Sequence, residues 1–301
     1  GLPGHFLGVS SGSSMTYSCL TPDTPVLTDG LEWVPVGQLE VGDRLVAFDE
    51  FPESRTRRRQ FRTAEVLNTT RKIAPTYRIE LEDGTVFHAT PNHRWLVSRD
   101  RKSPWEWVTT EKLYADHNHP PREKSRPWQF NRVMDTWETD RSWDAGFLAG
   151  MFDGEASLCY SRRGYGSHTL RLAQRKNGAW DQVLLSLKKL GFEFGEYYYP
   201  DRSDVAHLDI RGGEAAIVRF LGQVRPPRLL EKFWSDGGAE SLGQMVCRER
   251  VGIRSITRSI DQEIVELATT TETFIANGFA SHNTTESLNR LFVTNTLRPT
   301  Y

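Results

Sequence analysis

The chain has 301 residues, which is long for one domain and suits two. Its 38 Lys and Arg residues balance 39 Asp and Glu residues, so net charge does not point to nucleic acid as a partner. A membrane span and a secretory signal are not expected, because long apolar runs are missing and the start carries no basic residues. Three cysteines cannot complete a disulfide framework, so free thiols in a reducing compartment are expected.

The first ninety residues predict a compact, mostly β domain built from hairpins. Residues 1–18 are irregular and rich in Gly and Ser, whereas 25–34 contain two β-rich runs around an Asp-Gly turn. Residues 44–48 predict a further strand. Residues 76–81 and 85–90 alternate like two strands, and Glu82-Asp83-Gly84 between them predicts the turn of a second hairpin.

Two charged stretches interrupt this pattern. Residues 55–62 carry five arginines in eight positions, which could grip phosphates or lie on a solvated hairpin tip, and both interpretations stay open. Residues 115–140, with several prolines and many charges, predict a linker. His117 and His119 have no cysteine nearby, so the sequence gives little support to a metal site there.

The pattern becomes helical at Ser142, which can cap a helix over 143–152. Residues 177–190 predict a second helix with one apolar stripe and a stop at Gly191, and 214–221 predict a third. Runs 169–174 and 205–211 alternate like strands, so this region predicts an α-β-α-β-α order. After about residue 237 the pattern returns to β, with strands at 253–257 and 263–268 and an Asn-Gly turn at 277–278.

Two distant stretches carry reactive groups. The first is Ser18-Cys19, where the thiol can attack the preceding carbonyl and convert the amide into a thioester. This N-to-S acyl shift needs a proton donor for the leaving nitrogen and donors for the developing oxyanion. Thr90 and His93, which follow the second hairpin, could supply both.

The second stretch is His282-Asn283-Thr284. The side-chain nitrogen of Asn283 can attack its own carbonyl, which forms a succinimide and breaks the bond to Thr284. The Thr284 hydroxyl can first accept the acyl group from Cys19, and His282 can act as acid or base near neutral pH. Each group alone is ordinary, since a lone Cys is usually a small buried residue. Their order along the chain favours a joint function.

These stretches resemble the splicing blocks of inteins. Residues 19–26 resemble the first block, 84–93 the second, and 274–278 with 281–284 the closing blocks. The resemblance covers residues 19–283. It implies a mostly β, horseshoe-like Hint (hedgehog/intein) fold formed by both ends of the chain and interrupted by an α+β insert. It also implies autocatalytic protein splicing without a cofactor.

The resemblance assigns a role to each reactive residue. Cys19 makes the acyl shift, Thr284 receives the acyl group, Asn283 cyclises with help from His282, and an O-to-N shift joins Ser18 to Thr284. The penultimate block departs from the usual pattern, because Val265-Glu266-Leu267 has Glu where inteins often carry Asp or Cys. Glu266 is therefore expected in the role of that acid. Glu272 stands where many inteins carry His.

Asp153 and Glu155 lie at the C-terminal end of the predicted helix 143–152. Acids there oppose the helix dipole, a penalty that a bound cation such as Mg²⁺ would reverse. Gly146 and Gly150 would let a second helix approach closely, which is a layout for two-metal phosphodiester cleavage. The alternative is a capped core helix that ends at Gly154.

Residues 147–158 closely resemble the motif of LAGLIDADG homing endonucleases. The resemblance implies that Glu155 and Asp153 are catalytic, Mg²⁺-binding acids and that Gln174 is the active-site glutamine. It places an active-site basic residue in 225–233, with Lys232 preferred and Arg228 as the rival. The implied partner is double-stranded DNA, namely the host gene without the intein. Only one motif is present, so the implied full site is a homodimer through this helix, and an active and a degenerate nuclease both stay open.

The predicted domains are an N-extein segment 1–18, splicing-domain segments 19–135 and 241–283, an endonuclease domain 136–240, and a C-extein segment 284–301. When joined, residues 15–18 and 284–299 are similar to phage portal proteins, which implies a viral host protein made in a bacterial cytoplasm. The first alternative is a stand-alone LAGLIDADG DNA endonuclease without splicing. The second is a non-enzymatic fragment of a portal assembly, interrupted by a spacer.

Overall fold

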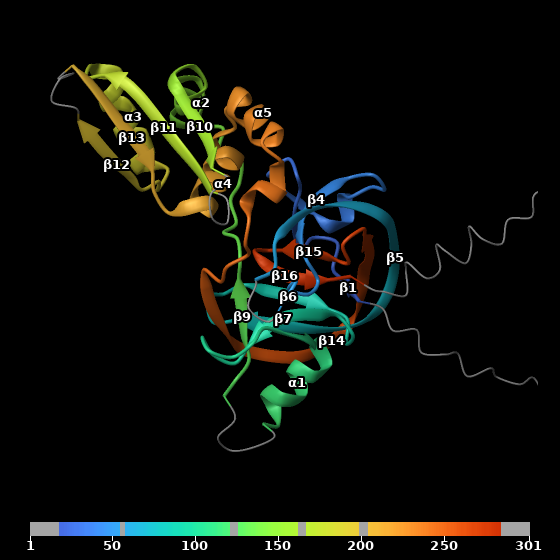
Figure 1. Cartoon of the computed structure of the whole chain (residues 1–301). Coiled ribbons are helices and arrows are strands. Elements are labelled where there is room, and N and C mark those ends of the chain that lie inside the picture. Colours follow the sequence, from blue (N-terminus) through green and yellow to red (C-terminus); the bar gives the residue numbers. More distant parts are fainter. Residues whose placement is uncertain (1–17, 55–57, 121–125, 162–166, 199–203, 284–301) are drawn as a thin grey trace, which may run out of the picture.

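The computed structural model describes residues 18–54, 58–120, 126–161, 167–198 and 204–283. Both predicted extein segments, except Ser18, lie outside this part of the chain, and so does Thr284. Arg55 and Arg57 of the arginine run also lie outside it. The described residues form a β lobe that contains both ends of the described chain, and a second lobe of helices and strands from its middle (Figure 1).

The β lobe is a 12-stranded sheet of the described residues, with its main path in the order β3-β2-β15-β16-β7-β9-β14-β1-β6-β5-β4. Its strands are β1 (Cys19–Leu20), β2 (Pro25–Leu27), β3 (Trp33–Pro35), β4 (Arg44–Phe48), β5 (Phe61–Leu81), β6 (Val86–Ala89), β7 (Arg94–Ser98), β8 (Glu106–Thr109), β9 (Gln129–Arg132), β14 (Glu249–Thr269), β15 (Thr273–Ala276) and β16 (Phe279–His282). A short 3₁₀ turn η1 (Val36–Gln38) and helix α1 (Thr110–Asn118) complete it. Residues from the two ends of the described chain therefore share one sheet.

The predicted hairpins are confirmed. Strands β2 and β3 pair around the turn at Asp29-Gly30, and β5 and β6 pair around Asp83-Gly84. Strands β15 and β16 are joined by Asn277 and Gly278, which have φ angles of 48° and 87°. Two consecutive left-handed residues are the requirement of a type I′ turn, whose twist matches that of the strands. This turn brings β16, and with it Ser281 and His282, back into the sheet.

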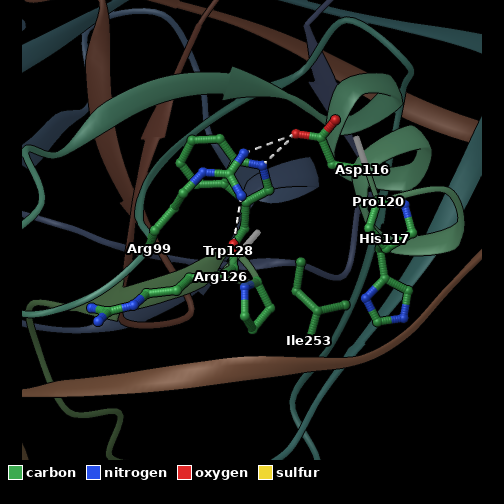
Figure 2. Close-up of a pocket in the computed structure, with 8 residues that line it drawn as sticks. Arg99, Asp116, His117, Pro120, Arg126, Trp128 and Ile253 are labelled. Atoms are coloured by element: carbon green, nitrogen blue, oxygen red, sulfur yellow. Dashed lines mark hydrogen bonds and ion pairs between the residues drawn. The ribbon is translucent and has the colours of Figure 1, made fainter. Parts of the chain in front are cut away.

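The expectation of a linker over residues 115–140 is wrong for the described residues. Helix α1 covers part of this range, and β9 pairs with β7, β14 and β16. The adjoining side chains also pack: Arg99 lies over the Trp128 ring at 3.8 Å, and the Trp128 indole N–H donates to Asp116 at 2.8 Å (Figure 2). Strand β9 has only four residues, so its alternation is too short to identify among polar neighbours.

The two longest strands were each predicted to be much shorter. β5 and β14 have 21 residues each, and they pair antiparallel along much of their length and curve around the lobe (Figure 1). The prediction of two strands at 253–257 and 263–268 is therefore replaced by one strand, with a register irregularity between Arg258 and Asp261. Solvent-facing residues such as Ile260, which is 79% exposed, break the alternation on which the prediction rested.

The second lobe contains α2 (Trp143–Glu155), β10 (Ala156–Ser161), β11 (Ser167–Arg175), α3 (Gly178–Lys189), β12 (Phe194–Tyr198), β13 (Val205–Ile210), α4 (Gly213–Val224) and α5 (Pro227–Ser235), followed by a 3₁₀ turn η2 (Gly238–Leu242). Its strands pair in the order β10-β11-β13-β12. The predicted helix starts are confirmed, because the Ser142 hydroxyl accepts from the Ala145 N–H and the Asn177 side chain caps α3.

The predicted α-β-α-β-α order is wrong, since the described order is α-β-β-α-β-β-α-α. The prediction missed β10, β12 and α5. β12 ends in three exposed residues, so it shows little alternation, and β10 continues directly from α2 without a turn. Helix α5 begins at Pro227, and proline is favoured at the first position of a helix because its missing N–H would have no intrahelical partner there.

The two lobes contact each other through the β2–β3 turn. The indole N–H groups of Trp137 and Trp234 donate to the carbonyls of Leu31 and Asp29, both at 3.1 Å. The Arg225 guanidinium donates to the Gly30 carbonyl at 2.6 Å. One continuous hydrophobic core extends across this contact into both lobes. None of the helices in the described ranges is long and apolar enough to cross a membrane.

Candidate active site

The short strand β1 places Cys19 in the middle of the sheet, between β6 and β14. Cys19 lies directly opposite Glu266 in the antiparallel register, and its side chain is 1% exposed. The Cys19 N–H donates to the Thr90 hydroxyl at 3.0 Å, and the Cys19 carbonyl accepts from the Thr90 N–H at 3.1 Å. Thr90 is therefore within hydrogen-bond distance of the nitrogen of the Ser18–Cys19 peptide bond.

The hydroxyl of Ser18 connects the two distant stretches. It donates to the His282 carbonyl at 2.9 Å and lies 3.1 Å from Nδ1 of His93. The other ring nitrogen of His93, Nε2, lies 2.8 Å from the Ser281 hydroxyl. Ser18, His93, Ser281 and His282 are all buried. The residue before Cys19 and the residue before Asn283 therefore meet in one site that excludes bulk water.

The His93 imidazole is neutral in this site. Its pKa is lowered from the ordinary value of 6.5 to about 3, chiefly by burial and in addition by the neighbouring charges of His282 and Arg94. Because the Ser18 hydroxyl proton goes to the His282 carbonyl, Nδ1 of His93 is the nitrogen that donates to Ser18. Nε2 then accepts from Ser281, which fixes one tautomer.

The Cys19 thiol is protonated at neutral pH. Burial raises its pKa strongly, the Glu266 carboxylate raises it further, and Lys72 acts in the opposite direction. Glu266 forms a short ion pair with Lys72 and is itself 6% exposed. A thiol in these surroundings needs a base before it can act as a nucleophile, because the thiolate is the reactive form.

His282 is held by charged groups on both sides of its ring. Nε2 lies 2.8 Å from a carboxylate oxygen of Glu50, and Nδ1 lies 3.1 Å from the Arg94 guanidinium. Since Arg94 can only donate, Nδ1 accepts in this arrangement and Nε2 carries the proton toward Glu50. Nδ1 also lies against the Asn283 carbonyl oxygen. The imidazole therefore lies beside the carbonyl of Asn283.

The side chain of Asn283 is also held in place. Its backbone N–H donates to the Glu272 carbonyl at 3.0 Å. Its hydrogen-bond partners assign the amide orientation: the nitrogen donates to the same carbonyl, and the oxygen accepts from the Thr269 N–H at 2.7 Å. Asn283 is fully buried, and Glu272 has a positive φ of 59° in the turn that supplies these partners. The turn between β14 and β15 thus positions the amide.

Two residues of this site, Glu50 and Arg94, were not predicted from the sequence. Glu50 follows β4 and is 232 residues away from His282 in the chain, so no local pattern connects them. Arg94 is adjacent to His93, but nothing in its type or spacing marks it. Glu50, Glu272 and His282 offer ligand atoms within 4.8 Å of one another. Two carboxylates and an imidazole could hold a divalent cation such as Zn²⁺.

The acids at the end of α2 have different surroundings. Glu155 is exposed as the last residue of the helix. One Asp153 oxygen accepts from the backbone N–H groups of Arg228 and Leu229, at 2.6 and 3.4 Å, at the start of α5. The Arg228 guanidinium donates to the Phe152 and Ala156 carbonyls at the end of α2. Asp153 and Arg228 therefore fasten α5 to α2.

The remaining predicted nuclease residues have local partners. The Gln174 side chain accepts from the N–H of Arg175 at 2.7 Å, and Lys232 pairs with Asp236 one helical turn away. In the described part of the chain, the one group of three or more close His, Cys, Asp or Glu ligands is Glu50–Glu272–His282. A Mg²⁺ ion at Glu155 would therefore need ligands beyond those that one chain gathers there.

Comparison with known proteins gives matches among solved structures. No family model and no curated protein matches the chain. Structural neighbours are inteins, among them the Ssp DnaB mini-intein variant M86, with 13% identity over 89% of this chain and 96% of that one and a TM-score of 0.39. A DnaB intein from Synechocystis sp. PCC 6803 gives 12% identity, 88% and 98% coverage and a TM-score of 0.36. A bacterial intein-like domain from Clostridium thermocellum gives 10% identity, 90% and 100% coverage and a TM-score of 0.37. The geometry of the site, and not these likenesses, carries the function proposed below.

Proposed function

We propose that the chain excises residues 19–283 from itself and joins the segments that flank them. The observation that carries this proposal is the Ser18 hydroxyl, which bonds both His93 and the carbonyl of His282. Ser18 and His282, which precede the two proposed cut points by no more than one residue and are far apart in sequence, thereby meet in one buried site. A site that only bound a ligand would not need both cut points side by side.

In the first step, the Cys19 sulfur attacks the Ser18 carbonyl carbon and the C–N bond to Cys19 breaks. Glu266 lies opposite Cys19, so its carboxylate is placed to take the thiol proton. The nitrogen leaves as an amine and gains the proton that the thiol gave up to Glu266, through a relay that ends at the Thr90 hydroxyl, which already contacts it. The Nδ1–H of His93 donates to the Ser18 hydroxyl and so holds Ser18 in position during the attack. The product is a thioester and a free amino group on Cys19.

In the second step, the Thr284 hydroxyl attacks the thioester and Cys19 leaves as a thiol. The Asn283 amide nitrogen then attacks the Asn283 carbonyl carbon, and the bond to Thr284 breaks with formation of a succinimide. His282 Nδ1, beside that carbonyl, takes the proton that the Asn283 amide nitrogen loses and passes it to the Thr284 nitrogen as that nitrogen leaves. Glu50 stabilises the imidazolium through Nε2. The freed amine then displaces the ester oxygen and forms a normal peptide bond.

The test is mass spectrometry of the purified full chain after incubation. The expected products are excised residues 19–283 and a peptide in which Ser18 is joined to Thr284. Cys19→Ala should abolish joining, and Asn283→Ala should abolish release at the second cut point. Cys159→Ala is the matched control, because Cys159 is an exposed free thiol in the other lobe and should not affect either product. Joining that persists in Cys19→Ala would refute the proposal.

A second function, cleavage of double-stranded DNA, is favoured by the exposed face of α2. A side-chain carbon added at Gly146, Gly150 or Gly154 would meet no atom within 4 Å, so this face is open to another helix. Glu155 ends the same helix and is exposed. We infer that two copies associate through α2 and that Glu155 and the free Asp153 oxygen of each copy hold Mg²⁺. The inferred target is the host gene without the insert.

Cleavage of DNA that spans the uninterrupted host gene, with and without Mg²⁺, tests this second function. Glu155→Gln should abolish cleavage and leave splicing unchanged. Glu231→Gln, which changes an exposed acid on α5, is the matched acidic control and should leave both unchanged. Gly150→Leu should block association of two copies in sedimentation. A monomer that cleaves DNA at the wild-type rate would refute the role of α2. From sequence resemblance alone, the host is inferred to be a portal-like phage protein of the bacterial cytoplasm.

A further inference from the structure

A groove on the β lobe is lined by five arginines, Arg58, Arg59, Arg101, Arg248 and Arg250, and we refer to it as the arginine groove. Its volume is about 1190 Å³. Among the described residues that line it, Glu106 is the one acidic side chain. Resting on the DNA-directed second function, we propose that the arginine groove binds the phosphodiester backbone of DNA. Its lining does not include Glu155 or a splicing residue, although its Trp107 ring lies 4.9 Å from the His282 ring.

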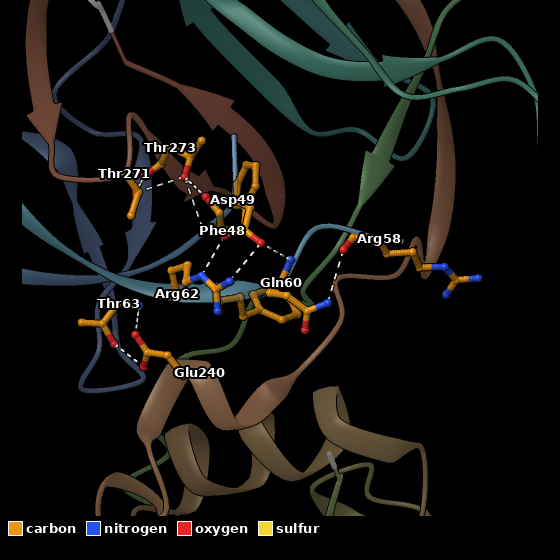
Figure 3. Close-up of polar contacts among 10 residues, drawn as sticks. Phe48, Asp49, Arg58, Gln60, Arg62, Thr63, Glu240, Thr271 and Thr273 are labelled. Carbon is orange, nitrogen blue, oxygen red and sulfur yellow. Dashed lines mark hydrogen bonds and ion pairs between the residues drawn. The ribbon is translucent and has the colours of Figure 1, made fainter. Parts of the chain in front are cut away.

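The arginine run predicted from the sequence divides into two parts in the structure. Arg62 is neutralised, because it forms an ion pair with Asp49 at 2.7 Å (Figure 3). Arg58 is exposed, its backbone carbonyl accepts from the Gln60 amide, and its guanidinium points away from this polar network. Arg62 is therefore structural, which neither interpretation of the run expected, whereas Arg58 is exposed and is placed to contact a phosphate.

The groove also contains an arginine nitrogen that protein groups do not satisfy. In the described part of the chain, Nε of Arg250 is buried and has no hydrogen-bond partner. An unmet donor is costly unless an acceptor arrives, and a phosphate oxygen is a suitable acceptor for guanidinium. Arg248 is partly neutralised by Asp135 at 3.1 Å, and Arg59 is tied to the Glu50 carbonyl at 3.0 Å. We therefore assign phosphate contacts to Arg58, Arg101 and Arg250.

Aromatic side chains are interleaved with these arginines. Phe51 is 63% exposed, and Trp105 and Trp107 line the same groove. The Arg59 guanidinium lies 5.8 Å from the centre of the Trp107 ring, so that ring is already covered in part. Exposed aromatic rings beside cations allow bases of a single strand to stack, in addition to the phosphate contacts that a duplex also makes.

The groove continues toward the other lobe. Arg58, Val246 and Arg248 also line a second cavity of about 530 Å³, which reaches the start of α4 at Gly212 and Gly213. The two cavities together form a path from the loop before β8 to the second lobe. A DNA molecule in the groove would therefore touch both lobes.

The test is DNA binding by the full chain in a background that neither splices nor cleaves, with Cys19→Ala, Asn283→Ala and Glu155→Gln and without Mg²⁺. The probes are a short fluorescent duplex and the corresponding single strand, titrated at several salt concentrations. The groove variant is R58Q/R101Q/R250Q. Its duplex affinity should fall by roughly tenfold or more near physiological salt, and its salt slope should shrink by about 2.7, at about 0.9 per lost phosphate contact.

The matched control is Lys112→Gln with Arg126→Gln and Arg141→Gln, three exposed cations outside the groove. It removes the same charge and should leave the salt slope unchanged. Equal weakening in both triple variants, or no weakening in the groove variant, would overturn the proposal. R58Q/R101Q, which changes exposed residues only, serves as the second variant if the triple variant fails to fold. Phe51→Ala should weaken the single strand more than the duplex.

Discussion

The buried His93 predicts how folding stability depends on pH. Its pKa is about 3 in the folded chain, against an ordinary value of 6.5. Between these two values the unfolded chain binds a proton at this position and the folded chain does not. Stability is therefore fully present above about pH 6.5 and is lost as pH falls toward 3. From about pH 7 to pH 5 the loss should be on the order of 2 kcal/mol for this one residue.

The assay is urea denaturation at several pH values of a chain blocked by Cys19→Ala and Asn283→Ala. His93→Gln removes the titrating ring, so the difference between the two profiles isolates this residue from all other groups. The variant should be less stable at neutral pH but should lose about 2 kcal/mol less between about pH 7 and pH 5. His119→Gln, an exposed histidine, is the control. Parallel profiles for His93→Gln and its parent would refute a buried neutral imidazole.

Three further predictions concern groups that position the site. Glu50→Gln should slow release at Asn283 by roughly a hundredfold and should not slow thioester formation. Spontaneous cleavage at Asn283 measures the release, and thiol-induced cleavage at Cys19 measures thioester formation. Equal slowing of both steps would contradict this prediction. Trp137→Ala should destabilise the chain by about 3–5 kcal/mol in thermal or urea unfolding, because it empties the contact between the lobes. Gly278→Ala should lower the unfolding temperature, since the added carbon would lie 2.4 Å from the Met134 carbonyl oxygen at a φ of 87°; an unchanged temperature would contradict the described turn.

Local features of the sequence determined much of the molecule. The cap at Ser142 and the turn at Asn277-Gly278 depend on residues within a few positions of one another, and both are found as predicted. The reactive residues were also identified from local motifs, because splicing chemistry requires particular groups next to each cut point. Strand lengths were not determined in this way, since the partners of β5 and β14 lie far away in the chain.

Only the tertiary structure decided the surroundings of the reactive groups. The register between β1 and β14 placed Glu266 opposite Cys19, and the end of β4 brought Glu50 to His282 across 232 residues. The tertiary structure also decided which arginines of the run are neutralised: Arg62 pairs with Asp49, whereas Arg58 is exposed. Sequence periodicity reports which face of an element is buried, but it carries no information about which distant element covers that face. The reactive residues could therefore be named from local motifs, whereas the charged groups around them were placed by pairing between distant strands.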